Sequence, residues 1–199
     1  AAAARASATA AGGVAGAWRP RAYVGIAGPQ AADHLQRIVS NDVLALAPGE
    51  SCEALLLTSK ARVIAPLVVL RRADDDFLLI TEPELGDVVS AELLRTRFAA
   101  RCELELEENR SLVVLGPNAV APDGFVALAC DDYGAGGLEL LDAAVPEGVS
   151  ELPEGELERR RVDVRVAVAV AADPRPRPQE GPREQVAVGP AGLDGPAHG

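Results

Sequence analysis

The chain has 199 residues, of which 48% are hydrophobic and 25% are charged, and its formal net charge is −11. This length allows one full core or two small lobes. No apolar run approaches the roughly 20 residues that cross a membrane, and the acidic balance argues against a general nucleic-acid surface. We therefore expect a soluble protein with no membrane partner.

The two ends of the chain differ in composition from the middle. Residues 1–17 contain ten Ala, which predicts a disordered Ala-rich leader or, alternatively, a transit segment. Residues 165–199 are rich in Pro and Gly and have no aromatic residue to anchor a core, which predicts a disordered tail. The expected location is the cytoplasm, or an organelle matrix if the leader is a transit segment.

Residues 18–108 are predicted to form a first lobe. In chain order, the pattern predicts strands at 22–27, 53–58, 63–71, 77–80 and 102–107, with helices at 29–39 and from 81 to about 100. Pro66 predicts a sheet edge or a bulge. This order favours an α+β fold, in which an antiparallel sheet carries both helices on one face, close to a ferredoxin-like lobe.

The second predicted helix begins with a capping signal. Thr81 is followed three residues later by Glu84, the spacing of a capping box with Thr81 as the N-cap. Five apolar side chains of this helix are expected to share one buried face: Leu85, Val88, Val89, Leu93 and Phe98.

A partial second lobe is predicted at residues 109–164. YVGIAGPQA at 23–31 and LVVLGPNAV at 112–120 share a strand, a Gly-Pro step and a polar residue followed by Ala, which indicates a duplicated unit. The second copy continues with strands near 124–129 and 138–141 and a short charged helix at 156–161.

The three cysteines are odd in number, widely spaced and without a CxxC pair, so we expect free thiols and no metal site. Cys52 and Cys102 are expected to be buried. Cys130 is expected to be the most exposed, with its pKa raised by Asp131 and Asp132. His34 and His198 offer little material for a Cys/His or Ser/His catalytic pair.

Three short motifs occur in order: Ser40-Asn41-Asp42-Val43, Leu57-Thr58-Ser59-Lys60-Ala61-Arg62 and Thr81-Glu82-Pro83. On these motifs, residues 18–161 resemble the YgfZ-type folate-binding proteins, relatives of the T-protein (aminomethyltransferase) of the glycine cleavage system. Their pattern reads Thr-Asn-Asp-Val, Leu-Thr-x-Lys-Gly-Arg and Thr-Glu-Pro. The resemblance implies duplicated lobes around a central opening that binds tetrahydrofolate or a derivative.

The resemblance places six candidate cofactor-binding residues at this opening: Asn41, Asp42, Lys60, Arg62, Thr81 and Glu82. Lys60 is the only Lys of the chain and shares a hairpin turn with Arg62, where both can pair with the glutamate carboxylates of a folate. A solvated turn is the alternative interpretation of this pair. Asn41 and Asp42 likewise either face the opening or only form a turn.

Two departures from the family leave open whether the chain is an enzyme. The acidic pair that assists methylene transfer in T-proteins is replaced by Ala65 and Pro66, which accept no proton. The Lys-Gly-Cys-Tyr-x-Gly-Gln-Glu segment of the YgfZ-type branch is missing, and after Val164 the match dissolves, as in a truncated, frameshifted or divergent copy.

Three functions remain open. The first is a YgfZ-type folate-binding protein linked to iron–sulfur cluster maintenance or tRNA modification, with iron–sulfur proteins as partners. The second is an aminomethyltransferase-like enzyme of one-carbon metabolism. The third is a binding-only remnant without catalysis. No catalytic residue is assigned.

Overall fold

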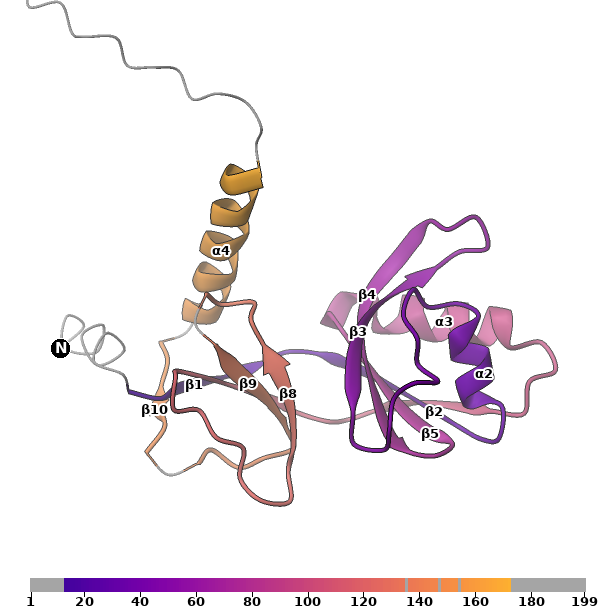
Figure 1. Cartoon of the computed structure of the whole chain (residues 1–199), viewed down its shortest axis with the longest axis horizontal. Helices are drawn as coiled ribbons and strands as arrows, with labels where there is room; N and C mark the ends of the chain where they lie inside the picture. Colours follow the sequence, from indigo (N-terminus) through magenta and orange to yellow (C-terminus); the bar gives the residue numbers. More distant parts are fainter. Residues whose placement is uncertain (1–12, 135, 147, 154, 173–199) are drawn as a thin grey trace, which may run out of the picture.

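The computed structural model describes residues 13–134, 136–146, 148–153 and 155–172, with side chains to Val164. Two five-stranded sheets lie side by side and form two lobes (Figure 1). The α+β class and the antiparallel character of the sheets are confirmed. Within the described part, no helix is long and apolar enough to cross a membrane.

The first sheet has the strand order β3-β4-β5-β2-β6 and is antiparallel throughout. Its strands are β2 (Ala22–Ala27), β3 (Ser51–Leu57), β4 (Val63–Ala73), β5 (Asp76–Thr81) and β6 (Glu103–Glu107). Helices α2 (Ala31–Gln36) and α3 (Gly86–Arg97) lie over one face, and the 3₁₀ helix η1 (Pro83–Leu85) precedes α3 (Figure 1). The predicted element order of this lobe is therefore correct.

The second sheet has the order β10-β1-β7-β9-β8. Its strands are β1 (Ala15–Arg19), β7 (Ser111–Leu115), β8 (Val126–Cys130), β9 (Gly137–Leu141) and β10 (Ser150–Glu151). Only the short β1–β10 pair is parallel. Helix α4 (Glu156–Ala172) follows β10 and stands on this sheet (Figure 1).

The predictions for the two ends of the chain need correction for those end residues that the structure describes. Residues 15–17 belong to β1 and pair with β7, although they were expected in a disordered leader. Small Ala side chains give little periodic signal, so the sequence pattern does not predict this strand. At the other end, α4 continues to Ala172 past its expected end at Arg161, so residues 165–172 are not a tail without structure. Residues 1–12 and 173–199 lie outside the described part.

The first sheet buries apolar side chains on both of its faces. On the helix side, Ile26, Phe77 and Leu79 pack with Leu35 of α2 and Leu93 of α3. On the other side, a smaller cluster joins the two lobes, and its members come from both sheets: Tyr23, Leu70, Leu78 and Ile80 from the first, and Leu128 and Leu141 from the second. The interlobe contact is therefore partly apolar.

The start of α3 differs from its prediction. Thr81 ends β5, and its hydroxyl donates to the Pro66 carbonyl at 2.8 Å, so it does not cap a helix. On α3, Val89 and Leu93 are buried as expected, but Val88 is 46% exposed. Phe98 follows the helix and is 89% exposed, because the chain turns there with φ 47° and leaves the helical face.

The repeated Gly-Pro step is also a repeat in three dimensions. Gly28 follows β2 with φ 130°, and Gly116 follows β7 with φ 136°, values that favour glycine. Each carbonyl then accepts a bond from the residue three further on, Ala31 in one case and Ala119 in the other. A helix follows only the first copy, since residues after Ala119 form a loop.

Pro66 lies where β4 is paired with β3 alone, because the pairing with β5 begins only at Val68. A register shift between Leu56 and Leu57 lies nearby. Both features agree with the predicted edge or bulge, since Pro offers no N–H to a second neighbour.

The β3–β4 turn holds Ala61 at φ 55°, where L-residues with a Cβ are strained. Ala61→Gly should raise the free energy of unfolding by about 1 kcal/mol, because glycine adopts this φ without a steric cost. Ala73→Gly at the exposed end of β4 is the matched control and should lower it. Chemical denaturation measures both, and an Ala61→Gly protein less stable than the parent would contradict the assignment.

His34 of α2 is 3% exposed, and its Nε2 has no hydrogen-bond partner among the described residues. Burial lowers the pKa of His34, and the charges of Arg37 and Arg97 lower it further, against an opposing backbone hydrogen bond at Leu93. A proton therefore binds the unfolded chain more readily. The stability contributed by neutral His34 is present above about pH 6.5 and is lost as the pH falls below it.

The difference in unfolding free energy between the parent and His34→Gln should thus be constant above pH 7 and shrink between pH 6.5 and 5. Denaturation curves at several pH values measure it. A difference that stays constant down to pH 5 would show that His34 binds its proton equally well in both states.

Candidate functional site

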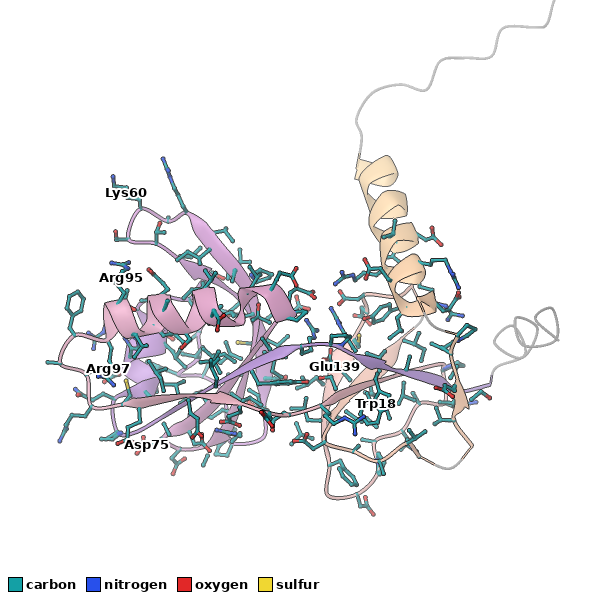
Figure 2. The ribbon with its side chains drawn as sticks, turned by 180° about the vertical axis from the view of Figure 1, so that it is seen from behind. Trp18, Lys60, Asp75, Arg95, Arg97 and Glu139 are labelled. Carbon is teal, nitrogen blue, oxygen red and sulfur yellow. The ribbon has the colours of Figure 1, made fainter. Side chains whose placement is uncertain are left out.

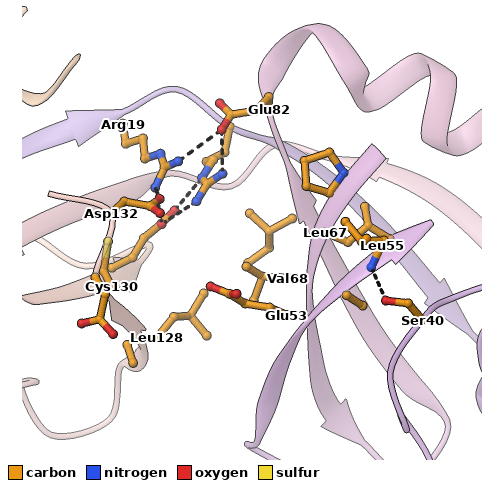
Figure 3. Close-up of a pocket in the computed structure, with 17 residues that line it drawn as sticks. Arg19, Ser40, Glu53, Leu55, Leu67, Val68, Glu82, Leu128, Cys130 and Asp132 are labelled. Carbon is orange, nitrogen blue, oxygen red and sulfur yellow. Dashed lines mark hydrogen bonds and ion pairs between the residues drawn. The ribbon is translucent and has the colours of Figure 1, made fainter. Parts of the chain in front are cut away.

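The chain passes from the second sheet to the first through Arg19, Pro20 and Arg21, between β1 and β2. The side chains of both arginines are less than a tenth exposed. Arg19 extends into the space between the two sheets (Figure 3), and Arg21 lines the same space. A crossing segment that buries two positive charges requires carboxylates close by.

Acidic side chains from both lobes meet these arginines. Arg21 donates to both oxygens of Glu139, at 3.0 and 2.9 Å. Arg19 donates to Asp132 at 3.0 Å and to Glu82 at 3.2 Å. Bidentate guanidinium–carboxylate pairs fix geometry as well as charge, so the two lobes are held in one arrangement here.

Helix α4 adds a third arginine. Arg161 donates to the same Oε1 of Glu82 at 2.8 Å, and so ties the second lobe's helix to the first lobe. We call the six side chains the interlobe charge cluster: Arg19, Arg21, Arg161, Glu82, Asp132 and Glu139. Three positive and three negative groups make it formally neutral.

The cluster keeps its most buried acid ionised. Glu139 has a side chain only 4% exposed. Burial by itself would raise the pKa of Glu139, but the hydrogen bond and charge of Arg21, a hydrogen bond from Ser111 and the charge of Arg19 hold it below its ordinary value. Burial by itself would lower the pKa of the Arg19 guanidinium, but the charges of Glu139 and the other acids outweigh it and raise this pKa.

A cavity of about 400 Å³ lies beside the cluster, between the two sheets (Figure 3). Its apolar walls come from both lobes: Leu55, Leu67, Val68 and Ile80 from the first, and Leu128 from the second. Two exposed acids, Glu53 and Asp131, also line it and have no ion pair among the described side chains. The cavity thus combines apolar walls with hydrogen-bond acceptors.

The polar turn after α2 supports a wall of this cavity. Ser40 lines the cavity, and its hydroxyl accepts the Leu55 amide at 2.9 Å (Figure 3). Asn41 donates to the Glu53 carbonyl at 2.9 Å, and Asp42 accepts the Leu44 amide. Asn41 and Asp42 therefore form a turn, and they do not line the cavity.

Lys60 and Arg62 lie elsewhere. Lys60 stands at the tip of the β3–β4 hairpin, far from Glu139 (Figure 2). In the same turn, the Arg62 amide donates to the Thr58 hydroxyl at 3.0 Å. Neither residue lines the cavity. The pair fits the alternative of a solvated turn.

Of the two candidates at the end of β5, Thr81 and Glu82, the structure brings one to the site. Thr81 is buried and bonded to the Pro66 carbonyl, whereas Glu82 lines the cavity and joins the cluster. The six predicted residues thus do not converge, since the cavity takes only Glu82.

Sequence reasoning missed Arg19, Arg21 and Glu139. One signal was available, because a Glu between leucines in β9 must face the side opposite Leu138 and Leu140. Its partners lie about 120 residues away in the chain, and no local pattern reveals such a distance.

Of the two positions that replace the T-protein acidic pair, only Pro66 lies at the cavity. Ala65 is buried in the core beside α2 and α3. Neither supplies a carboxylate. Among the side chains described here, no group of three or more His, Cys, Asp or Glu could hold a metal ion.

The thiols depart from the prediction in their exposure. Cys102 is buried as expected, but Cys52 is half-buried and Cys130 is only 5% exposed. Cys130 faces Tyr133 in the core below α4, while Asp131 turns outward. Burial raises the pKa of Cys130 to about 11; the Asp132 carboxylate adds to this, although the predicted cause was the acids alone.

Comparison with known proteins gives one family and one fold. The sequence model of the GCVT N-terminal domain matches residues 21–122. A comparison with curated proteins finds no match. Among solved structures, the glycine cleavage system aminomethyltransferase T from Bartonella henselae is similar, with 17% identity and a TM-score of 0.64. The match covers 76% of this chain and 51% of that one, so the chain spans about half of its length.

Thiol labelling tests the burial of the cysteines. One equivalent should react quickly with a thiol reagent in the native protein, and Cys52→Ala should remove it, because Cys52 alone among the three is not buried. Cys130→Ala, the matched control, should leave the fast phase unchanged. A thiol that still reacts quickly in Cys52→Ala would show that Cys102 or Cys130 is accessible, which would contradict their burial.

Proposed function

The chain belongs to the GCVT N-terminal domain family, and on this premise we propose that it binds a reduced folate in the cavity between its two lobes. The observation that carries the proposal is the cavity itself. Apolar walls from both sheets enclose about 400 Å³ beside a buried, ionised carboxylate. Pockets of this size hold small organic ligands.

The chemistry of the walls suits the ring system of a folate. The pyrimidine half of a reduced pterin is planar and apolar on its faces, and its edge carries N–H donors. Val68, Ile80 and Leu128 offer apolar contacts to the faces. Glu53 and Asp131 offer carboxylate oxygens to the edge.

For the cellular role, we favour a YgfZ-type protein that acts in iron–sulfur cluster maintenance or tRNA modification, with iron–sulfur proteins as partners. Ala65 and Pro66 supply no base at the cavity, which supports this role over amine transfer. The alternative is an aminomethyltransferase-like enzyme, which the similarity to a T-protein fold favours. A binding-only protein is the third candidate.

Titration calorimetry with tetrahydrofolate tests the ligand. We expect binding that Leu55→Trp weakens at least tenfold, because an indole fills the cavity. Leu106→Trp is the matched control, since Leu55 is 38% exposed in the first sheet and lines the cavity, while Leu106 is 52% exposed and does not. No heat at millimolar tetrahydrofolate, or equal loss in both variants, would overturn the proposal.

The hairpin basic pair is tested in the same experiment. Lys60→Ala with Arg62→Ala should leave the affinity unchanged if the turn is only solvated. A clear loss would restore these residues as partners of the glutamate tail.

A further inference from the structure

Helix α3 has an outer surface that no other described element covers, and Figure 2 shows this helix in front of the first sheet. Its inner side packs on the sheet through Val89 and Leu93, which are both fully buried. Apolar side chains also lie on its outer side, where Val88 is 46% exposed and Leu94 is 52% exposed. Phe98, just after the helix, is 89% exposed. Exposed apolar side chains that gather on one surface mark an interaction site.

The outer side of α3 carries charges of opposite sign at its two ends. Asp87 is exposed in the first turn and has no ion pair among the described side chains. Arg95, in the last turn, pairs with Glu92 of its own helix, and its side chain is still 61% exposed. Ala91 lies midway and is exposed. Because Asp87, Ala91 and Arg95 are four residues apart, they form one ridge along the helix.

Ridges of this spacing determine how two such helices pack. Helices that interdigitate their i±4 ridges cross at about −50°, the commonest class, and a small residue at the crossing point brings the axes close together. In an antiparallel pair centred on Ala91, Asp87 of each copy lies beside Arg95 of the other. Val88 and Leu94 then each lie near their own counterparts. The outer surface of α3 is therefore complementary to itself, both in charge and in apolar contacts.

We propose that this surface is a dimer interface, at which two copies of the chain pair their α3 helices antiparallel about a two-fold axis beside Ala91. A two-fold interface uses the same surface on both copies, which requires such self-complementarity. A purely anionic or purely cationic partner would match only one end of the ridge. The inference goes beyond the proposed function and is independent of it, because α3 and the cavity lie on opposite faces of the first sheet.

The size of the surface sets the expected strength of the dimer. Helix α3 has 12 residues and is about 18 Å long. An interface confined to one helix of this length buries less than the roughly 1,200 Å² at which stable complexes begin. We therefore expect a reversible dimer with a Kd on the order of 100 µM.

Sedimentation equilibrium of the full chain tests the dimer. Samples from about 10 µM to about 1 mM protein span the expected Kd, and about 0.15 M salt screens the repulsion between two chains of net charge −11. The average mass should rise with concentration from that of a monomer towards that of a dimer.

Charge reversal tests the antiparallel pairing. Asp87→Arg alone and Arg95→Asp alone should each weaken self-association at least about tenfold, because like charges then meet at both ends of the interface. An equimolar mixture of the two variants should associate at least as well as the parent, since each chain then meets the opposite charge at both ends. Glu105→Arg is the matched control, because it reverses an exposed acid of β6 outside this surface. It should leave the affinity unchanged.

Three results would overturn the proposal. They are a parent chain that stays monomeric at about 1 mM, an Asp87→Arg protein that dimerises as well as the parent, and a mixture that gains no affinity over its components. If either single variant fails to fold, the double variant Asp87→Arg with Arg95→Asp decides, since it restores both ion pairs within one homodimer. A double variant that associates at least tenfold more weakly than the parent would then contradict the pairing.

Discussion

The bidentate ion pair between Arg21 and Glu139 is the contact on which the arrangement of the two lobes depends. Arg21 lies where the chain enters the first sheet, and Glu139 lies in the second. Both are buried, and removing one partner of a buried pair leaves an uncompensated charge at a cost of about 3–5 kcal/mol. The arrangement is therefore specified by charge at the point where the chain crosses between the sheets.

The apolar part of the interlobe contact is modest, which makes the charge cluster more important. Six buried residues form it, and Leu128 and Leu141 are the contribution of the second sheet. This contact also explains why β5, in the first lobe, has no solvated face. β5 is buried at nearly every position, because helices cover one face of the sheet and the second lobe covers the other. A strand with one solvated face would alternate instead.

Sequence reasoning succeeded where the signal was local. The order of elements in the first lobe follows from apolar periodicity, and the two Gly-Pro turns follow from a residue type with a special φ. It failed for β1, whose Ala-rich sequence resembles a leader, and for the exposure of Cys130, which depends on Tyr133 and α4. It also failed to find Arg19, Arg21 and Glu139, because their grouping depends on how two sheets face each other.

The neutrality of the cluster determines what the cavity attracts. Arg19 and Arg21 are occupied by protein carboxylates, so neither is free to bind an anionic ligand. The uncompensated charges on the cavity wall are those of Glu53 and Asp131, both negative. An anionic group that enters would meet repulsion, whereas N–H donors would meet acceptors. On the proposed function, a folate would therefore enter ring first, with its glutamate carboxylates toward solvent.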